Sequence, residues 1–187
     1  MAQSIYPFFE STIMHIAFKY IAIFSLFTLS ACSSVTKDIQ IETQADPKTS
    51  FDGYQSYAWL ASSEIVYDPL GQWEPRGLDI DSEVRFVIND NLRDRGLVEV
   101  VDKPDMYIVF GAGVDMTALG MKENPASKEE MLMNIPQAAL VVGFIDADTG
   151  YLVWRGIAEG EAVGDRDLKD TRKRIEYAVK KMFKQIP

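Results

Sequence analysis

The residue with the most distinctive chemistry in this sequence is Cys32, because it is the only cysteine of the chain. It follows an apolar run over residues 20–29 and the small residue Ala31, and Lys19 places a positive charge before the run. A charged flank, an apolar core of ~7–15 residues and a small-residue cleavage site are typical of a secretory signal peptide. The sequence therefore predicts a signal peptide over residues 1–31, cleaved between Ala31 and Cys32.

The start of this signal peptide is unusual. Residues 1–13 contain Glu10 but no lysine or arginine, which is a poor N-terminal region for a signal peptide. The segment from Met14 to Lys19 supplies the expected charge, so we predict that translation starts at Met14. The alternative is an uncleaved membrane anchor over residues 13–31, which is just long enough to span a bilayer but would bury a lysine.

The four residues that end at the cysteine, Leu29 to Cys32, resemble a bacterial lipobox. In that motif the cysteine thiol takes a diacylglycerol before the signal peptide is removed. The resemblance implies that Cys32 becomes the first residue of the mature protein and carries acyl chains such as palmitate. Ser33, in place of an aspartate, resembles lipoproteins sorted to the outer membrane, which implies a place on its periplasmic face in a Gram-negative bacterium. Residues 33–37 then form a tether that reaches at most ~18 Å.

The mature chain, residues 32–187, has a length typical of one domain. Its composition limits the kinds of catalytic and metal-binding sites that it can contain. The only histidine, His15, lies in the signal peptide, so the mature domain has no imidazole and no second thiol. These absences exclude Ser-His-Asp and Cys-His catalysis, the usual zinc sites and a disulfide. Only carboxylate, Ser-Lys or oxygen-ligated metal chemistry survives. Because no motif supports it, we expect no enzymatic activity, no metal and no cofactor. The net charge of −9 also disfavours binding to nucleic acid.

Apolar periodicity predicts one α+β domain over residues 38–187. Residues 79–95 and 167–184 repeat apolar side chains at three- and four-residue steps, as amphipathic helices do. Gly96 follows the first helix, where a C-terminal cap is expected. Short β-prone runs predict an antiparallel sheet of four to six strands, with both helices packed on one face. The expected strands are residues 38–43, 54–60, 97–101, 106–110, 138–146 and 151–156.

Two connecting segments have distinctive compositions. Residues 61–78 contain two prolines and two glycines, which predicts a loop. The segment from Asp146 to Gly150 begins like a calcium-binding loop. However, Gly150 stands where a third side-chain ligand is needed, and Ile157 stands where the bidentate glutamate is needed. The sequence therefore favours a plain hairpin turn between two strands.

Several short motifs follow one another along the mature chain. They are Tyr-x-Ser-Tyr-x-Trp at residues 54–59, Asp-x-x-Val-Arg-x-x-Ile-x-x-x-Leu-x-x-x-Gly at 81–96, an Asp-led apolar run at 105–110, Asp-x-x-Thr-Gly-x-x-Val-Trp-Arg-Gly at 146–156 and Ala-Val-x-x-Met-Phe…Pro at 178–187. In this order they resemble the bacterial lipoprotein family named domain of unknown function 4136 (DUF4136), over roughly residues 32–187. The resemblance implies an α+β periplasmic domain tethered to a membrane, and it implies no particular activity.

The segment from Met116 to Pro136 departs from this family pattern, and we predict a long surface insertion with one helical turn. Methionine side chains suit adaptable apolar interfaces, and tryptophan and arginine are frequent binding anchors. The candidate contacts for an envelope protein partner are Met116, Met121, Met131, Met133 and Arg155. The alternatives are a loop without a partner and, for the Trp154-Arg155 pair, a core tryptophan beside a solvent-exposed arginine.

Three hypotheses of function follow from the sequence. The first is a non-enzymatic envelope lipoprotein, held at the membrane by the lipid on Cys32, that binds or supports another periplasmic or membrane component. The second is a carrier of a small molecule or lipid, with a pocket between sheet and helices. The third is a hydrolase of unfamiliar type with two carboxylates in a deep pocket. We expect the first, because no motif supports catalysis.

Overall fold

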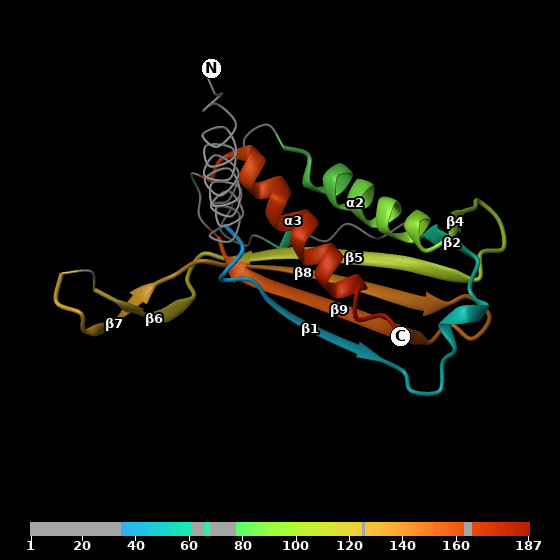
Figure 1. Ribbon diagram of the computed structural model, residues 1–187, viewed down its shortest axis with the longest axis horizontal. Helices are drawn as coiled ribbons and strands as arrows, with labels where there is room; N and C mark the ends of the chain where they lie inside the picture. The colour runs from blue at the N-terminus through green and yellow to red at the C-terminus, as the bar shows by residue number, and fades with distance from the viewer. Residues whose placement is uncertain (1–34, 61–65, 68–77, 125, 163–165) are drawn as a thin grey trace, which may run out of the picture. The chain divides into compact units, whose positions relative to one another are not determined.

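A computed structural model describes residues 35–60, 66–67, 78–124, 126–162 and 166–187. The chain divides into two compact units, Met1–Lys37 and Asp38–Pro187, and the second contains every helix and strand labelled in Figure 1. The predicted signal peptide with Ala31, the predicted acylation site Cys32 and most of the expected loop over residues 61–78 lie outside the described residues. Within the described ranges, no helix is long and apolar enough to cross a membrane.

One layer of the second unit is a sheet with strand order β1-β9-β8-β5-β2-β4, and β3 also pairs with β5. The three central strands β5, β8 and β9 have ten residues each and run antiparallel to one another. Burial alternates along β5, where Met106, Ile108 and Phe110 point to the core, as the two-residue period of a strand requires. The strands are Gln40–Ala45 (β1), Ser56–Trp59 (β2), Val66–Tyr67 (β3), Val98–Glu99 (β4), Met106–Asp115 (β5), Gln137–Asp146 (β8) and Leu152–Glu161 (β9).

The sheet is mixed, whereas a wholly antiparallel sheet was expected. β2 pairs parallel with both β4 and β5, and β3 pairs parallel with β5. The reason is the chain connection, because helix α2 (Ile80–Asp94) lies between β2 and β5 in sequence. A strand–helix–strand crossover brings the second strand back in the same direction. The α+β class and the packing of two helices on one face are confirmed.

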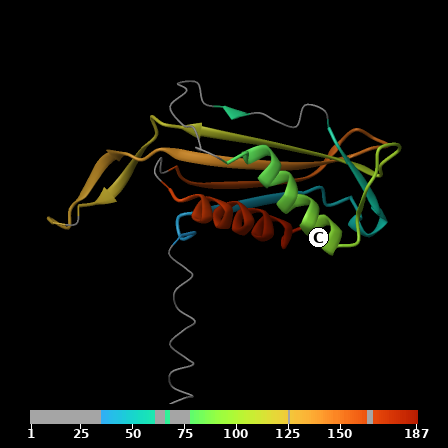
Figure 2. The same cartoon turned by 90° about the horizontal axis from the view of Figure 1, so that it is seen from above.

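Helices α2 and α3 (Leu168–Phe183) lie beside each other on one face of the sheet (Figure 1 and Figure 2). Both begin where the sequence predicts, because an aspartate caps each helix. The Asp79 carboxylate accepts a hydrogen bond from the backbone N–H of Ser82 at 3.1 Å, and Asp167 accepts one from the backbone N–H of Lys169 at 3.3 Å. Gly96 follows α2 with φ +85°, a left-handed conformation that favours glycine.

The hydrophobic core fills the space between the helices and the sheet. Its largest side chain is Trp154, whose ring packs against Phe144 and Phe183 at centroid distances of 4.6 and 5.6 Å. A Cβ atom at Gly156 would lie 2.7 Å from this indole, so the glycine makes room for it. The helices contribute Val84, Val87, Ile88, Leu92, Ala178, Val179, Met182 and Phe183 to the core.

The helical turn predicted in residues 116–136 is wrong, because this exposed segment forms a β-hairpin. β6 (Leu119–Glu123) and β7 (Glu130–Asn134) pair antiparallel with each other and, within the described ranges, with no further strand. They follow on from the β5–β8 pair (Figure 1). At the junction the three residues after β5 face only two before β8, Ile135 and Pro136, which makes a β-bulge. We call β6, β7 and their connection the arm.

Candidate functional site

The arm carries five exposed large apolar side chains. Side chains alternate between the two faces of a strand, so the register places Leu119, Met121 and Leu132 on one face of the arm. These side chains are 66%, 57% and 64% exposed, and Met121 stands directly opposite Leu132. The three residues therefore form one apolar surface, which we call the arm patch.

The second face of the arm is partly covered by its own chain. The side chain of Ile135 lies over Gly120, since a Cβ atom there would be 2.9 Å from Ile135 Cδ1. Lys122 extends its ammonium group to 3.7 Å from the carboxylate of Glu161, at the end of β9. The two methionines of this face are still nearly half exposed. The arm is thus tied to the sheet on one face and open on the other.

The structure brings together three of the four candidate methionines, Met121, Met131 and Met133, on the arm. Met116 lies at the bulge before β6 and is half-buried. Sequence reasoning missed the two leucines of the arm patch, because it considered methionine alone. The two-residue spacing of Leu119 and Met121 is the signal that could have found them.

Arg155 lies in the main sheet and not on the arm. In the strand register it faces Gln44 of β1 and Gly143 of β8, and its guanidinium donates to Gln44 Oε1 at 3.1 Å. Its charge is also 3.4 Å from the Glu42 carboxylate. Trp154, by contrast, is 1% exposed, which confirms a core tryptophan beside an outward-facing arginine. Arg155 therefore joins two strands at the surface.

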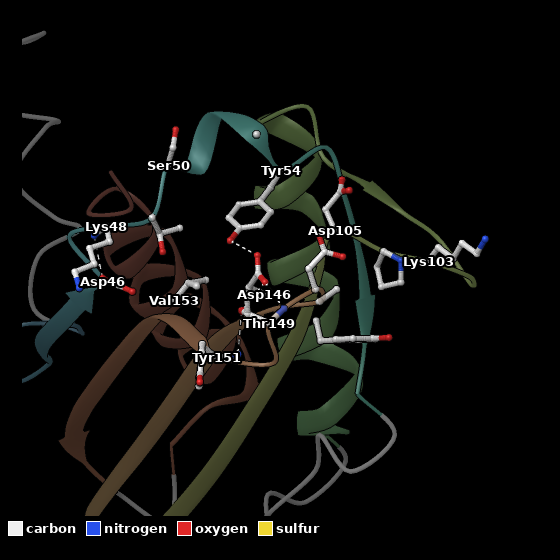
Figure 3. A pocket seen from close by; sticks show the side chains of 16 residues that line it. Asp46, Lys48, Ser50, Tyr54, Lys103, Asp105, Asp146, Thr149, Tyr151 and Val153 are labelled. Carbon is white, nitrogen blue, oxygen red and sulfur yellow. Dashed lines mark hydrogen bonds between the residues drawn. The ribbon is translucent and has the colours of Figure 1, made fainter.

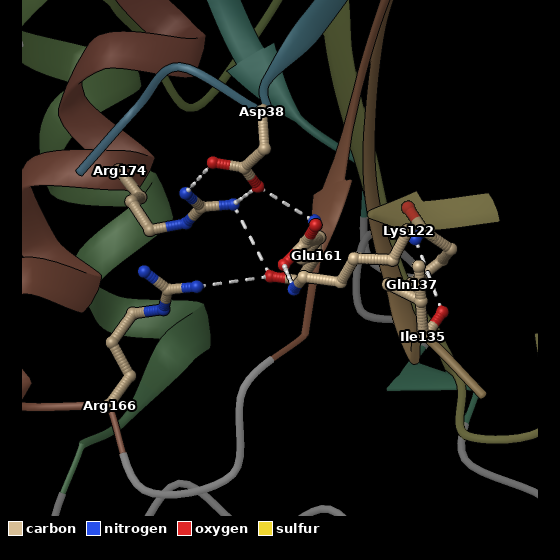
Figure 4. A network of polar contacts seen from close by, with 7 residues as sticks. All are labelled: Asp38, Lys122, Ile135, Gln137, Glu161, Arg166 and Arg174. Carbon is tan, nitrogen blue, oxygen red and sulfur yellow. Dashed lines mark hydrogen bonds and ion pairs between the residues drawn. The ribbon is translucent and has the colours of Figure 1, made fainter. Parts of the chain in front are cut away.

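A polar cluster holds the start of β1 at the end of the sheet that bears the arm (Figure 4). Asp38 accepts two hydrogen bonds of 2.6 Å from the guanidinium of Arg174 and one of 2.8 Å from the backbone N–H of Glu161. Arg174 and Arg166 also donate to the Glu161 carbonyl. Burial alone would raise the pKa of the Asp38 carboxyl, but the hydrogen bonds and the Arg174 charge outweigh it and lower the pKa to about 2.

An open cavity of about 770 Å³ lies at the other end of the sheet, among the β1–β2, β4–β5 and β8–β9 connections (Figure 3). Asp146 accepts hydrogen bonds from the backbone and hydroxyl of Thr149 and from the Tyr54 hydroxyl, at 2.6–2.9 Å. Asp105 accepts from two backbone N–H groups and from the Ser56 hydroxyl. These bonds lower the pKa of both carboxyls, whereas burial and Asp146 raise the pKa of Tyr54 to about 12.

These bonds give the two aspartates a structural role in closing loops. Gly150, at φ +72°, completes the β8–β9 connection as the hairpin turn that the sequence favoured over a calcium loop. In the part of the chain that the structure describes, no group of three or more acidic, histidine or cysteine side chains could hold a metal ion. The cavity lies between loops, whereas the carrier hypothesis placed it between sheet and helices.

The aromatic motif at residues 54–59 also joins elements. The Tyr57 hydroxyl and the Trp59 Nε1–H both donate to Asn89 Oδ1 of α2, at 2.9 and 3.1 Å. Both side chains therefore lie on the helix-covered face of the sheet, and the motif ties β2 to α2.

The fold and these contacts define a two-layer α+β domain in which short motifs tie strands to helices and close loops. The chain belongs to the family described as domain of unknown function (DUF4136), whose model matches residues 41–187. The resemblance seen in the sequence is therefore confirmed.

Three solved structures illustrate the likeness. A DUF4136 family protein from Bacteroides thetaiotaomicron has 14% identity and a TM-score of 0.53, with 79% of this chain and 95% of that chain covered. A PDZ domain protein from Parabacteroides distasonis has 13% identity and a TM-score of 0.49, over 80% of this chain but only 37% of that one. A minor lipoprotein from Acinetobacter baumannii has 11% identity and a TM-score of 0.34, over 71% and 91%. The first of these shows a shared fold. No curated protein matches the chain.

Proposed function

We propose that this chain is a lipid-anchored, non-enzymatic binding component of the Gram-negative cell envelope, held on the periplasmic face of the outer membrane by acyl chains on Cys32. The observation that carries the binding role is the arm patch, where three apolar side chains are each more than half exposed. Exposed apolar groups that adjoin one another mark interaction sites. The arm has only two strands where it extends beyond the main sheet, so a partner that covers the patch also stabilises the arm.

The lipobox resemblance and the family membership support the lipid anchor. Cys32 precedes Asp38 by six residues, which span at most ~22 Å when fully extended. The hydrogen bonds of Asp38 to Arg174 and Glu161 hold the first residue of the domain beside the base of the arm, because Glu161 also pairs with Lys122. The domain itself therefore begins at the same end of the sheet as the arm.

Two features support a role without catalysis. The mature sequence contains no histidine and no thiol besides Cys32. In the loop cavity, Asp105 and Asp146 accept hydrogen bonds from donors of their own chain, which accounts for both carboxylates by loop closure. The carrier hypothesis needs space between sheet and helices, where Ile88, Phe144 and Met182 are 0–1% exposed.

The test has two parts. The intact mass of the protein from detergent-solubilised membranes, beside a Cys32→Ala variant, reports the anchor. We expect the native protein to begin at Cys32 with added acyl mass and the variant to lack it. A photo-crosslinking residue at Leu132, beside one at Val101, reports the binding surface, since Val101 is apolar and 95% exposed but lies outside the arm. We expect a discrete protein adduct at position 132 only, and co-purified lipid without an adduct would favour a carrier.

A further inference from the structure

We propose that the arm pairs with the arm of a second copy of this chain, through antiparallel contact between two β7 strands centred on Leu132. The inference rests on the proposed function and names the partner of the arm. It begins from the free edge of β7, which in the described part of the chain pairs with β6 alone. An edge strand presents a row of backbone N–H and C=O groups to which another strand can pair.

Alternate residues of β7 direct their backbone groups toward this free edge. The N–H of Ile135 and the carbonyl of Glu129 both bond across the hairpin to the β6 side, each at 2.9 Å. Because these directions alternate along an antiparallel strand, odd-numbered positions face β6 and even-numbered positions face away. The residues whose backbone groups face the free edge are Glu130, Leu132 and Asn134.

This pattern is complementary to itself. When two β7 strands run antiparallel with Leu132 opposite Leu132, Glu130 lies opposite Asn134 and Met131 lies opposite Met133. Outward-facing positions then meet outward-facing positions, as the hydrogen-bond pattern of an antiparallel pair requires. Apolar side chains meet apolar side chains, and no two like charges stand opposite each other.

The other edge of the arm, formed by β6, is not complementary to itself. Two β6 strands centred on Met121 would place Leu119 opposite Glu123 and Gly120 opposite Lys122. Neither arrangement is a favourable cross-strand pair, because an apolar side chain faces a carboxylate and an ammonium group faces no side chain. The β7 edge is therefore the one that fits a second copy.

Pairing two arms stabilises each of them, because an arm by itself has only two strands. It produces a four-stranded sheet in the order β6-β7-β7-β6, in which the two arm patches join on one face. Three or more strands with an apolar face are stable where a lone hairpin is marginal. Glu130 is the only charged residue of β7, so the net charge of −9 on each chain is largely kept out of the contact. Anchoring both copies to one membrane raises their effective concentration.

A lipid surface fits the arm less well. The strand ends and the connection at its tip carry Glu123, Glu129 and Glu130, against Lys122 and Lys128. Anionic phosphates of lipid headgroups repel this net negative tip. The arm patch also lies behind the charged tip and not at its end, so insertion into a bilayer would carry the glutamates with it.

Disulfide formation in the membranes of cells that make the full chain tests the pairing. Leu132→Cys and Met121→Cys each place one thiol on the arm patch, at positions directly opposite each other within one arm. In the proposed dimer the two positions 132 have Cα atoms ~5.5 Å apart, within the reach of a disulfide. The two positions 121 are three strand spacings apart, ~14 Å, and out of reach. Oxidation should convert Leu132→Cys to a species of twice the monomer mass and leave Met121→Cys monomeric.

A mixed experiment tests the register. Met131→Cys and Met133→Cys chains with different tags are made in the same cells, because the proposed pairing puts these positions opposite each other at ~4.5 Å between Cα atoms. We expect a disulfide that joins the two tags. Each variant made alone should stay monomeric, because its own copies lie ~8 Å apart, beyond the ~7 Å limit for a disulfide.

Three results would overturn the proposal: equal cross-linking of Leu132→Cys and Met121→Cys, cross-linking of neither, and adducts of Leu132→Cys with a different protein or with lipid only. The unsubstituted chain is the control for the anchor, since its only cysteine is Cys32. An acylated Cys32 has no free thiol and gives no dimer. A dimer linked through Cys32 refutes the lipid anchor, and the arm pairing is then decided by the same variants in a Cys32→Ala background.

Discussion

The body of the domain and the arm use apolar residues in opposite ways. In the body, the rings of Phe144, Trp154 and Phe183 are at most 1% exposed and pack against one another. On the arm, Leu119 and Leu132 are more than 60% exposed. Both regions are built from paired β-strands, since β6 and β7 follow the β5–β8 pair. The presence of strands therefore does not explain why apolar side chains are buried in the body and exposed on the arm. Helices cover the body, and none of the described helices contributes to the arm.

The motifs on which the family resemblance was based belong to the body. Tyr57 and Trp59 bind Asn89 of α2, Asp146 closes the β8–β9 turn, and Asp105 holds the start of β2. None of these motifs falls within residues 119–134. The contacts of these motifs therefore explain how the body folds, whereas the surface proposed for binding lies outside the motifs.

The largest expected effect is in the body, at Trp154. Trp154→Ala removes the central side chain of the core and leaves a cavity between Phe144 and Phe183, which should lower the free energy of unfolding by about 3–5 kcal/mol. Leu132→Ala on the arm is the matched control and should change it by less than about 0.5 kcal/mol. Urea denaturation followed by circular dichroism measures both. Equal effects would contradict the contrast between body and arm.

The next largest loss of stability is expected where Asn89 accepts two hydrogen bonds that join β2 to α2. Asn89→Ala leaves the hydroxyl of Tyr57 and the indole N–H of Trp59 without their acceptor, which should cost about 1–3 kcal/mol. Asn91→Ala on the same helix is the control, because Asn91 only donates to the Val87 carbonyl of its own helix. The urea midpoint at an unchanged m-value separates the two variants. If Asn91→Ala lowered the stability as much as Asn89→Ala, the loss would come from the helix itself and not from the contact of Asn89 with Tyr57 and Trp59.

A smaller effect is expected at Asp38, with a defined dependence on pH. The folded-state pKa of about 2 lies below the ~3.9 of an unfolded aspartate, so the ionised carboxylate stabilises the fold above pH ~4. This stabilisation is lost as the pH falls from ~4 toward ~2. Because Asp38 is partly exposed to solvent, we expect a loss of about 1–2 kcal/mol.

Asp38→Asn, compared with wild type at pH 6 and pH 3, measures this contribution. The variant should be less stable than wild type at pH 6, and the difference should shrink at pH 3. Glu42→Gln is the control, because Glu42 is an exposed acid whose 3.4 Å ion pair with Arg155 lies in solvent. A difference between Asp38→Asn and wild type that stays constant with pH would show that the carboxylate charge is not what holds the cluster.

The sequence predicted the body well because its signals are local. Asp79, Asp167 and Gly96 mark the helix ends through contacts within a few residues, so both helices were placed to within one residue. The parallel pairing of β2 with β5 could not be read from the strands, since it depends on where the crossover helix returns the chain. The Asp38 cluster was also missed, because its partner Arg174 lies 136 residues away in sequence.

The arm was mispredicted for a related reason. Its strands are short, and Lys122, Glu123 and Glu130 interrupt the apolar alternation that predicts a strand. The pairing of β6 with β7 continues from β5 and β8, which lie on either side of the segment, so the hairpin is favoured by the ladder beside it and not by its own composition. Methionine content suggested residues 116–136 as a contact surface, which stays a prediction, and the strand register shows which residues share a face of the arm.

The smallest expected effect on stability is that of a charge on the arm, and it tests most directly the contrast between buried apolar side chains in the body and exposed ones on the arm. Leu132→Lys should change the free energy of unfolding by less than about 0.5 kcal/mol, since the new charge stands in water. Val142→Lys on β8 is the matched change, and it should be severely destabilising because Val142 is fully buried. The measurement belongs at low concentration, where the chain is monomeric, because dissociation of paired arms would otherwise add to the apparent loss. If Leu132→Lys destabilised the monomer as Val142→Lys does, Leu132 would belong to the core, and its exposure would be no reason to assign it a partner.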